Sequence, residues 1–286
     1  MSKILVSGAN GFVGKNLCRA LKQLNHDVIE LTSSAGDIID TKTWETIPPT
    51  DTVIHLAAKT FVPDSWKNPD LFLQTNTLGT VMALEYCRKY NARMVFISSY
   101  LYGNPESLPI HETAKIVTPN PYALSKKGAE DYCKFYADSF NVNMVIIRPF
   151  NLYGYGQSDN FLIPEIILQV LKGKEVHVKD LEPKRDYIYI ADFIDAIIRS
   201  IDMHQFELFN IGSGISYSVG EIIQMIQDIC GTAIPVISSA EKRPAEIMDT
   251  VADISKAKEL LNWTPTTSIY DGLSAIVQLY KQAQQA

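Results

Sequence analysis

The stretch Gly8-Ala9-Asn10-Gly11-Phe12-Val13-Gly14 follows the apolar run Lys3–Ser7 and opens a segment whose apolar residues recur at helical spacing. Between a strand and a helix, the first glycine permits a tight turn, the second lets the backbone approach a pyrophosphate, and the third lets helix and strand pack closely. The helix N-terminus adds free N–H groups and a positive dipole. The spacing is GxxGxxG rather than GxGxxG, so a plain strand-to-helix turn is the alternative. The stretch predicts a dinucleotide-binding loop with contacts from Gly8, Asn10, Gly11, Phe12, Val13 and Gly14.

Outward from this loop, short apolar runs alternate with segments of helical spacing. Asn120 suits the N-cap of one helix, and Pro121 suits its first position, where the missing N–H would have no partner. Unbroken apolar strands that alternate with helices indicate a parallel sheet covered on both faces. We therefore predict an α/β fold with a doubly wound parallel sheet. Its strands are Lys3–Ser7, His26–Leu31, Thr52–Leu56, Met94–Ile97 and Met144–Ile147, and its helices lie near residues 12–24, 70–90 and 121–140.

After residue 150 the alternation loosens, and glycine and proline turns become more frequent. Helices are predicted near residues 161–172, 191–201, 218–230 and 268–283, and Asp186–Ile190 resembles a strand. We expect residues 1–150 to form the cofactor-binding domain. Residues 151–286 would mainly form a smaller C-terminal α/β lobe that binds the substrate and is partly interleaved with the sheet.

The composition excludes several classes of function. The chain has 286 residues, enough for one large domain or a large domain with a smaller partner, and its net charge of −6 argues against binding to nucleic acid. The four cysteines are widely spaced and the five histidines are scattered, so we expect reduced thiols and no metal site. No apolar run approaches the length of a membrane span, and no signal peptide is evident. The expectation is a cytoplasmic protein that does not bind membranes.

Tyr122 and Lys126 lie four residues apart on the predicted helix 121–140, hence on one face of it. A phenol with a pKa of about 10 is a poor base at neutral pH, but an adjacent ammonium and a cationic nicotinamide would stabilise its phenolate. Tyr122 would then exchange a hydroxyl proton while hydride moves to or from the cofactor. Ser98, at the carboxyl end of a strand, would hydrogen-bond the reacting oxygen. A YxxxK pair alone arises by chance in many helices, but the ordered set of glycine loop, strand-end serine and YxxxK predicts a hydride-transfer site.

The end of the second strand bears on which dinucleotide is bound. An acid usually stands there to bind the adenosine ribose diol, but the position is Thr32, and Glu30 lies two residues early. The hydroxyls of Thr32 and the serines after it can bind a 2′-phosphate, with Lys15 nearby, which favours NADP(H) over NAD(H). Asp37 is placed to accept a hydrogen bond from the adenine amino group, and a plain turn aspartate is the alternative.

Taken together, the motifs resemble the extended short-chain dehydrogenase/reductase family that acts on nucleotide sugars. The matches run nearly end to end: GANGFVG, IHLAAK, FISSYLYG, PYALSK, IIRPFNLYGYG, RDYIYIADFIDAI, FNIGSG, RPAEI and ADISKAKELLNW. The resemblance implies a Rossmann domain, a lobe for a nucleotide-diphosphate sugar, and Ser98, Tyr122 and Lys126 as the catalytic group. It also implies a homodimer, formed through the helices at 70–90 and 121–140. Tyr132, Phe135 and Tyr136 give the second helix aromatic surface for this contact, and core packing is the alternative for them.

Further contacts follow from the same resemblance. For the cofactor they are Thr32, Asp37, Ile38, Leu56, Ala57, Ala58, Lys59 and Asn76, with a helix cap as the alternative for Asn76. For the substrate they are Thr60, Val62, Ser99, Tyr100, Asn151, Arg185, Tyr187, Arg243 and Glu246. Guanidinium forks match phosphate oxygens, whereas a surface ion pair is the alternative for each arginine.

The residues after Ser98 reduce the number of reactions that the resemblance allows. Dehydratases of this family carry an Asp-Glu pair there and decarboxylases a glutamate, but this chain has Ser99 and Tyr100. Two reactions remain: reduction at C4 of an NDP-4-keto-6-deoxyhexose, and 4-epimerisation of an NDP-hexose with tightly held NAD. Three features favour the reductase. The second strand lacks the ribose-binding acid, and the region between this strand and Thr52 is short. In addition, the segments Lys59–Val62 and Ser98–Tyr102 are similar to those of dTDP-4-dehydrorhamnose reductases. A redox sensor or binding module is a third interpretation, against which the retained catalytic group argues.

Overall fold

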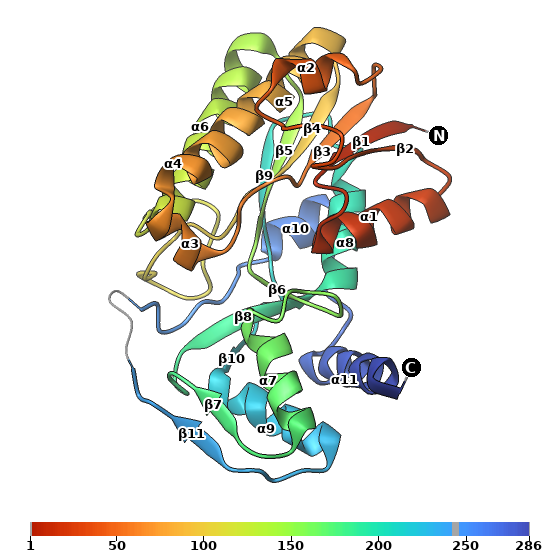
Figure 1. Cartoon of the computed structure of the whole chain (residues 1–286). Helices are drawn as coiled ribbons and strands as arrows, with labels where there is room; N and C mark the ends of the chain where they lie inside the picture. Colours follow the sequence, from red (N-terminus) through yellow and green to blue (C-terminus); the bar gives the residue numbers. More distant parts are fainter. Residues whose placement is uncertain (1, 242–245, 286) are drawn as a thin grey trace.

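A six-stranded parallel sheet forms the centre of the larger lobe in the computed structural model, which describes residues 2–241 and 246–285 (Figure 1). Its strand order is β2-β1-β3-β4-β5-β9. The strands are β1 (Lys3–Ser7), β2 (Asp27–Leu31), β3 (Thr52–His55), β4 (Arg93–Ile97), β5 (Met144–Pro149) and β9 (Glu207–Ile211). The predicted α/β fold with a doubly wound parallel sheet is confirmed. The five predicted strands all form: β1 has the predicted ends, and each of the others differs by one or two residues at one end.

The strand order reverses next to β1. Val6 of β1 pairs with Glu30 of β2 on one side and with Ile54 of β3 on the other. The connection after β1 therefore runs to β2 on one side, and the connection after β3 runs to β4 on the other, which opens a crevice at the carboxyl ends of β1 and β3. The predicted glycine loop follows β1 at this crevice.

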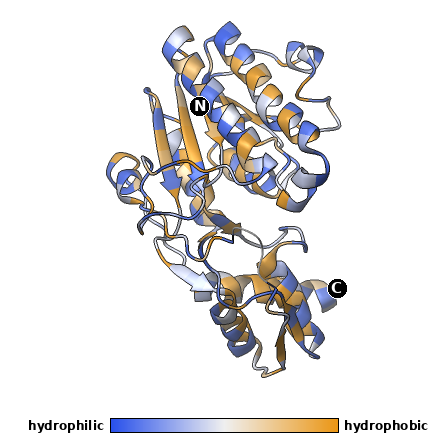
Figure 2. Cartoon of the chain, turned by 90° about the vertical axis from the view of Figure 1, so that its left-hand side faces the viewer, coloured by the Kyte–Doolittle hydropathy of each residue, from blue (hydrophilic) through white to orange (hydrophobic). Residues whose placement is uncertain are grey.

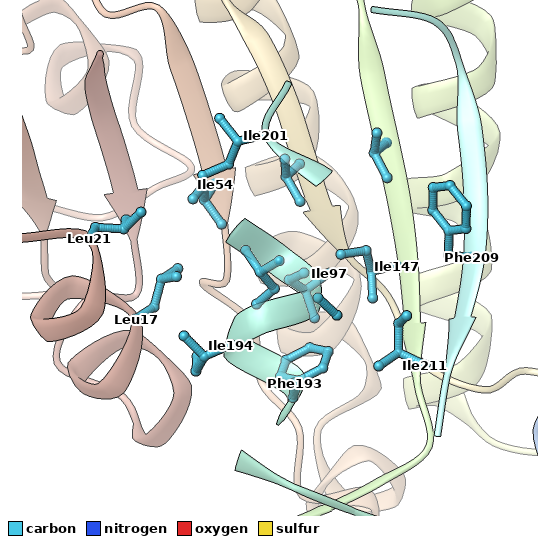
Figure 3. Packing of buried hydrophobic residues seen from close by; sticks show 14 of the residues in the cluster. Leu17, Leu21, Ile54, Ile97, Ile147, Phe193, Ile194, Ile201, Phe209 and Ile211 are labelled. Atoms are coloured by element: carbon cyan, nitrogen blue, oxygen red, sulfur yellow. The ribbon is translucent and has the colours of Figure 1, made fainter. Parts of the chain in front are cut away.

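Helices cover both faces of the sheet. On one face, α1 (Phe12–Gln23) and α8 (Ile190–Ser200) enclose a core in which Leu17 and Phe193 face Ile54 and Ile147 (Figure 3). Burying each such side chain contributes about 1.5–3 kcal/mol. The other face is covered by α2 (Thr41–Glu45), α5 (Gly79–Tyr90) and α6 (Pro121–Phe140). The predicted helix 121–140 is thus confirmed, and Asn120 caps it by accepting a hydrogen bond from the Ala123 N–H at 2.8 Å.

The predicted single helix at 70–90 is interrupted. The chain forms the short helices α3 (Val62–Lys67) and α4 (Pro69–Phe72), then a π-helical segment, Leu73–Leu78, and only then α5. A π-helical turn is wider than an α-turn and is frequent at functional sites. Here it carries Asn76 into the interior, where the side chain is 1% exposed.

The smaller lobe lies below the carboxyl edge of the sheet in the view of Figure 1. A three-stranded sheet, ordered β10 (Ser216–Ser218), β8 (Lys184–Tyr189) and β6 (Asn151–Tyr153), packs with α7 (Leu162–Lys172), α9 (Val219–Cys230) and α11 (Ile269–Gln285). A two-stranded sheet, β7 (Val176–Val178) and β11 (Val236–Ser238), completes the lobe. Orange apolar segments of the strands and helices lie inside each lobe in Figure 2.

The chain crosses between the lobes more than once. After β6 to β8 it returns to the large sheet as α8 and β9, and later as α10 (Ser255–Leu260), which packs on β9. Sequence patterns did not predict β9, which pairs with β5 some sixty residues earlier in the chain.

Asp186 of β8 connects chain segments that lie between the two lobes. Its buried carboxylate accepts hydrogen bonds from the N–H and hydroxyl of Ser213, from the Gly214 N–H and from the Ala252 N–H, at 2.6–3.0 Å. Three segments distant in sequence therefore meet at one side chain. Within the described residues, no helix is long and apolar enough to cross a membrane.

The close packing of α1 on β1 predicts the effect of adding a methyl group at Gly14. A Cβ there would lie 2.3 Å from the Gly8 carbonyl oxygen, which is backbone and cannot move aside. We expect Gly14→Ala to lower the free energy of unfolding by about 1–3 kcal/mol, as overpacking does. Urea-induced unfolding followed by circular dichroism measures it.

Gly220 provides the matched control, because it also lies in the first turn of a helix. Its nearest neighbour to a new Cβ would be 3.7 Å away, an ordinary contact. Gly220→Ala should raise the free energy of unfolding by about 0.5–1 kcal/mol through helix propensity. Equal changes in the two variants would contradict the packing argument.

Candidate active site

The glycine loop forms a cradle at the carboxyl ends of β1 and β3. Gly8 has a φ of +74°, and a Cβ on it would lie 2.8 Å from the Ala57 nitrogen. A Cβ on Gly11 would meet only the Gly8 carbonyl oxygen, at 3.2 Å, so this side of the loop stays open. Gly11 is the N-cap of α1 and offers no side-chain cap, which leaves the N–H groups of the first turn available to an anion. The loop fits a dinucleotide pyrophosphate.

The end of β2 carries hydroxyl groups at the position where a ribose-binding carboxylate is usual. Thr32 Oγ1 and Ser34 Oγ lie 2.7 Å apart. Glu30 is turned to Lys22 of α1, with 2.6 Å between its Oε1 and Nζ. Asp37 accepts a hydrogen bond from the Ile39 N–H at 3.2 Å, as a turn aspartate does, and Ile38 is buried against Gly79.

Asn76 connects the segment after β3 to helix α6 through hydrogen bonds. Leu56, Ala57 and Ala58 follow β3 and are half-buried. The Asn76 amide accepts from the Lys59 N–H at 2.8 Å and donates to the Lys59 carbonyl and to Ser125 Oγ, each at 3.0 Å. Its side chain therefore makes no helix cap, the alternative raised from the sequence. It fixes the backbone at Lys59 relative to the residue next to Lys126.

Ser98, Tyr122 and Lys126 lie around the carboxyl end of β4. Ser98 follows this strand directly, its side chain is buried, and its Oγ has no hydrogen-bond partner among the described residues. Tyr122 is in the first turn of α6 and hydrogen-bonds to Ser99. Lys126 Nζ donates to the Ile97 carbonyl at 2.6 Å and lies 4.7 Å from the centre of the Phe96 ring. A buried hydroxyl without a partner is costly, so Ser98 is ready to bond an oxygen of a ligand.

Burial is the main cause of the pKa shifts of Tyr122 and Lys126. It raises the pKa of Tyr122 to about 12, although the hydrogen bond with Ser99 acts in the opposite direction. It lowers the pKa of Lys126 to about 8, against the attraction of Glu130. The sequence led us to expect that Lys126 would lower the pKa of Tyr122. In the protein by itself the phenol pKa rises instead, because desolvation outweighs the hydrogen bond with Ser99.

The residues predicted to contact substrate come from both lobes. From the large lobe come Thr60 and Val62 before and in α3, and Ser99 and Tyr100 after β4. Tyr100 stacks on Phe150 and donates a long hydrogen bond of 3.5 Å to the side-chain oxygen of Asn151 in β6.

From the smaller lobe come Arg185 and Tyr187 on β8. The guanidinium of Arg185 donates to the carbonyls of Lys184 and Ile247 and forms an ion pair with Glu246. Burial raises the pKa of Tyr187, whose hydroxyl has no partner among the described residues. Arg243 lies outside the described residues.

Sequence reasoning missed a buried polar network behind the catalytic helix. Glu130 of α6 forms an ion pair with Arg148 of β5, and Arg148 also donates to the Tyr102 hydroxyl at 2.7 Å. A signal existed, because Glu130 stands four residues after Lys126 and so shares its helix face. Asp186 was also missed, although an acid between Arg185 and Tyr187 in an apolar strand is unusual.

Comparison with known proteins identifies the family. Residues 4–212 match the model of the NAD dependent epimerase/dehydratase family. The chain is 30% identical to GDP-6-deoxy-D-mannose reductase of Pseudomonas aeruginosa over 96% of both chains.

Two solved structures share the fold over nearly the whole chain. The structure of RMD from Pseudomonas aeruginosa complexed with NADPH superposes with a TM-score of 0.92, at 28% identity, and covers 99% of this chain and 100% of that one. UDP-glucose 4-epimerase from Thermotoga maritima with UDP-glucose also gives a TM-score of 0.92, at 27% identity, with 99% of each chain covered. The chain thus belongs to the NAD dependent epimerase/dehydratase family and is an NAD(P)-dependent nucleotide-sugar enzyme of the extended short-chain dehydrogenase/reductase type.

Proposed function

We propose that the protein reduces the 4-keto group of an NDP-4-keto-6-deoxyhexose with NADPH. The observation that carries this proposal is the end of β2, where Thr32 and Ser34 present hydroxyls and Glu30 is occupied by Lys22. This corner offers donors to a 2′-phosphate and no free carboxylate to a ribose diol. A cofactor that is used once and released suits a reductase.

Two further observations support reduction over other chemistry of the family. Ser99 and Tyr100 stand beside Ser98, where a carboxylate would be needed for dehydration or decarboxylation by the routes considered above. The relatives also include a GDP-6-deoxy-D-mannose reductase and a structure with NADPH. We assign the dinucleotide to the crevice formed by residues 1–150, and the sugar nucleotide mainly to the lobe that follows.

In this assignment each catalytic side chain has a separate task. The nicotinamide supplies the hydride when it is bound. Ser98 Oγ hydrogen-bonds the keto oxygen and satisfies its own unmet hydrogen bond. Tyr122 delivers the proton that turns this oxygen into a hydroxyl, and its raised pKa keeps it in the protonated form required for delivery. Lys126 contributes a positive charge that favours the tyrosinate left behind.

Arg185 is assigned to the diphosphate of the substrate. Its guanidinium is half-buried and already oriented by two carbonyl oxygens, so little side-chain entropy remains to be lost on binding. Tyr187 pairs with Asn151 of β6, which is hydrogen-bonded to Tyr100, and these three residues are assigned to the sugar nucleotide.

A 4-epimerase is the second candidate, favoured by the equally high structural similarity to a UDP-glucose 4-epimerase. The two functions differ in how the dinucleotide is held. An epimerase returns the hydride to its own substrate and holds NAD throughout the cycle, whereas a reductase exchanges the cofactor in each turnover.

Cofactor retention separates the two candidates. We expect purified protein to carry little dinucleotide after gel filtration and to bind NADPH saturably and more tightly than NADH, because Thr32 and Ser34 can bond the 2′-phosphate. Absorbance, fluorescence and calorimetry measure this. Thr32→Glu should weaken NADPH binding tenfold or more through charge repulsion, by about 1.4 kcal/mol. Stoichiometric NAD that survives gel filtration would contradict the reductase proposal.

Tyr122→Phe removes the proton donor and leaves the ring. We expect kcat for NADPH-dependent reduction of an NDP-4-keto-6-deoxyhexose to fall by about 10²–10⁴-fold, because general acid catalysis is lost. NADPH binding should persist, as calorimetry would show. Tyr270→Phe makes the same change at an exposed tyrosine of α11 and should leave kcat unaltered. Full activity of Tyr122→Phe would be incompatible with the assigned role.

We propose that two copies of the chain associate through α6 and the elements beside it. Tyr132 and Phe135 of α6 are 46% and 53% exposed. Leu124 of α6 is exposed as well, as are Leu73 and Leu78 of the π-helical segment that contacts α6. Figure 2 views this side of the large lobe, where orange segments interrupt the blue of the helices. Core packing does not account for Tyr132 and Phe135, whereas Tyr136 is buried.

Phe135→Glu should convert the dimer to a monomer, because it places a charge in the proposed apolar interface. Size-exclusion chromatography with light scattering measures the mass. Leu279→Glu, at an exposed leucine of α11, is the control and should remain dimeric. A wild-type chain that is monomeric at micromolar concentration would refute this assembly.

A further inference from the structure

We propose that Glu130 is a positioning residue for Lys126. Its carboxylate, which is hydrogen-bonded to Arg148, keeps the amino group of Lys126 in the charged ammonium form. The inference rests on the proposed role of Lys126 in the hydride-transfer site. It adds a residue that lies outside the group of Ser98, Tyr122 and Lys126.

Lys126 and Glu130 lie one turn apart on the buried face of α6. Their exposed fractions are 3% and 5%, so neither charge is solvated by bulk water. Lysine and glutamate are rarely buried to this degree unless they are paired. A negative charge one turn along the helix therefore acts on the ammonium through a medium that screens poorly.

Arg148 holds this carboxylate in place with two bonds. Its Nε lies 2.9 Å from Glu130 Oε1 and its Nη2 lies 2.6 Å from Oε2. The neighbouring residue Ile147 pairs with Ile97, whose carbonyl accepts the bond from Lys126 Nζ. The ion pair and the ammonium are thus fixed to adjacent strands, β5 and β4, at the edge where the catalytic group lies.

Arg148 is itself prevented from turning away. Its Nη1 donates to the Tyr102 hydroxyl at 2.7 Å and to the Glu112 carbonyl at 3.3 Å. The Tyr102 hydroxyl in turn donates to the side-chain oxygen of Asn210 in β9 at 2.6 Å. Stability alone is a weak reason for such an arrangement, because replacing a buried ion pair by apolar residues is often neutral or stabilising.

The other titratable groups near Lys126 supply no negative charge. On α6, burial raises the pKa of Tyr122 to about 12 and that of Cys133 well above its usual range, so both stay neutral. From β3, His55 has its pKa lowered to about 3 by burial and by the charge of Lys126, so it is neutral too. Behind Glu130 stand the cation of Arg148 and the phenol of Tyr102, whose pKa burial raises. Further along, the carboxylate of Glu112 accepts from the Asn210 N–H.

Glu130 therefore opposes the desolvation that lowers the pKa of Lys126 to about 8. The sign of the effect is clear. Removing the carboxylate lowers this pKa further, and the charge that Arg148 then leaves unpaired acts in the same direction. The ammonium would be lost near neutral pH, where the wild-type protein keeps it.

The test is a titration of Lys126 in the full chain, with lysine labelled with carbon-13 at Cε and observed by NMR. The Lys126 signal is assigned by its loss in Lys126→Met. We expect Glu130→Gln to lower the pKa of Lys126 by about one unit or more, and Glu130→Asp to restore most of the shift. Asp138→Asn removes an equal charge from the exposed face of the same helix and should change nothing.

Turnover provides a second readout that a merely structural role would not move. The active form is the ammonium, so activity is present below the pKa of Lys126 and is lost as pH rises through it. The alkaline limb of the kcat profile should therefore move to lower pH by about one unit in Glu130→Gln.

A folded Glu130→Gln protein in which the Lys126 titration is unchanged would overturn the inference. If this variant fails to fold, Glu130→Leu combined with Arg148→Leu replaces the pair by apolar side chains of similar size. A lowered pKa in that double variant supports the inference, and an unchanged one overturns it. The titration needs no sugar nucleotide, so its result is separate from the success or failure of the proposed reduction.

Discussion

The close approach of α1 to β1 is the constraint on which the other parts of the site depend. At Gly14 there is no room for even a Cβ, because the Gly8 carbonyl oxygen occupies that space. The helix N-terminus is thereby fixed over the carboxyl ends of β1 and β3, with its free N–H groups facing the crevice. Ser98 follows β4 at the same edge of the sheet, so the loop proposed to bind phosphate and the serine proposed for catalysis are positioned by one sheet.

The smaller lobe is attached to this frame by the chain returning to the large sheet, rather than by a linker. β8 carries Arg185 and Tyr187, which are proposed to bind substrate, while Asp186 between them accepts hydrogen bonds from Ser213, Gly214 and Ala252. Because side chains alternate along a strand, the residues proposed for binding lie on one face of β8 and the structural carboxylate lies on the other. A shift of β8 by one residue would exchange the two faces and disrupt both.

The features of the fold that depend on local sequence patterns could be predicted. The glycine loop, the first five strands of the sheet and the capped helix that begins at Pro121 follow from apolar periodicity and from turn and cap chemistry. The edge strand β9 did not follow, since its apolar run is short and interrupted by Asn210. The π-helical turn at Asn76 was also missed, because a periodic pattern cannot reveal one inserted residue in a turn. The raised pKa of Tyr122 in the protein by itself did not follow from sequence, because burial depends on the whole fold.

The unpartnered hydroxyl of Ser98 has a consequence for discrimination between ligands. A buried donor that lacks a partner in the described chain costs about 1–3 kcal/mol. That free energy is recovered only by a ligand that brings an oxygen to this point. A sugar deoxygenated at the reacting carbon would fill the same volume and leave the cost in place. If Ser98 binds the reacting oxygen as proposed, the site would discriminate against such an analogue by withholding a hydrogen bond, with no need for a steric clash.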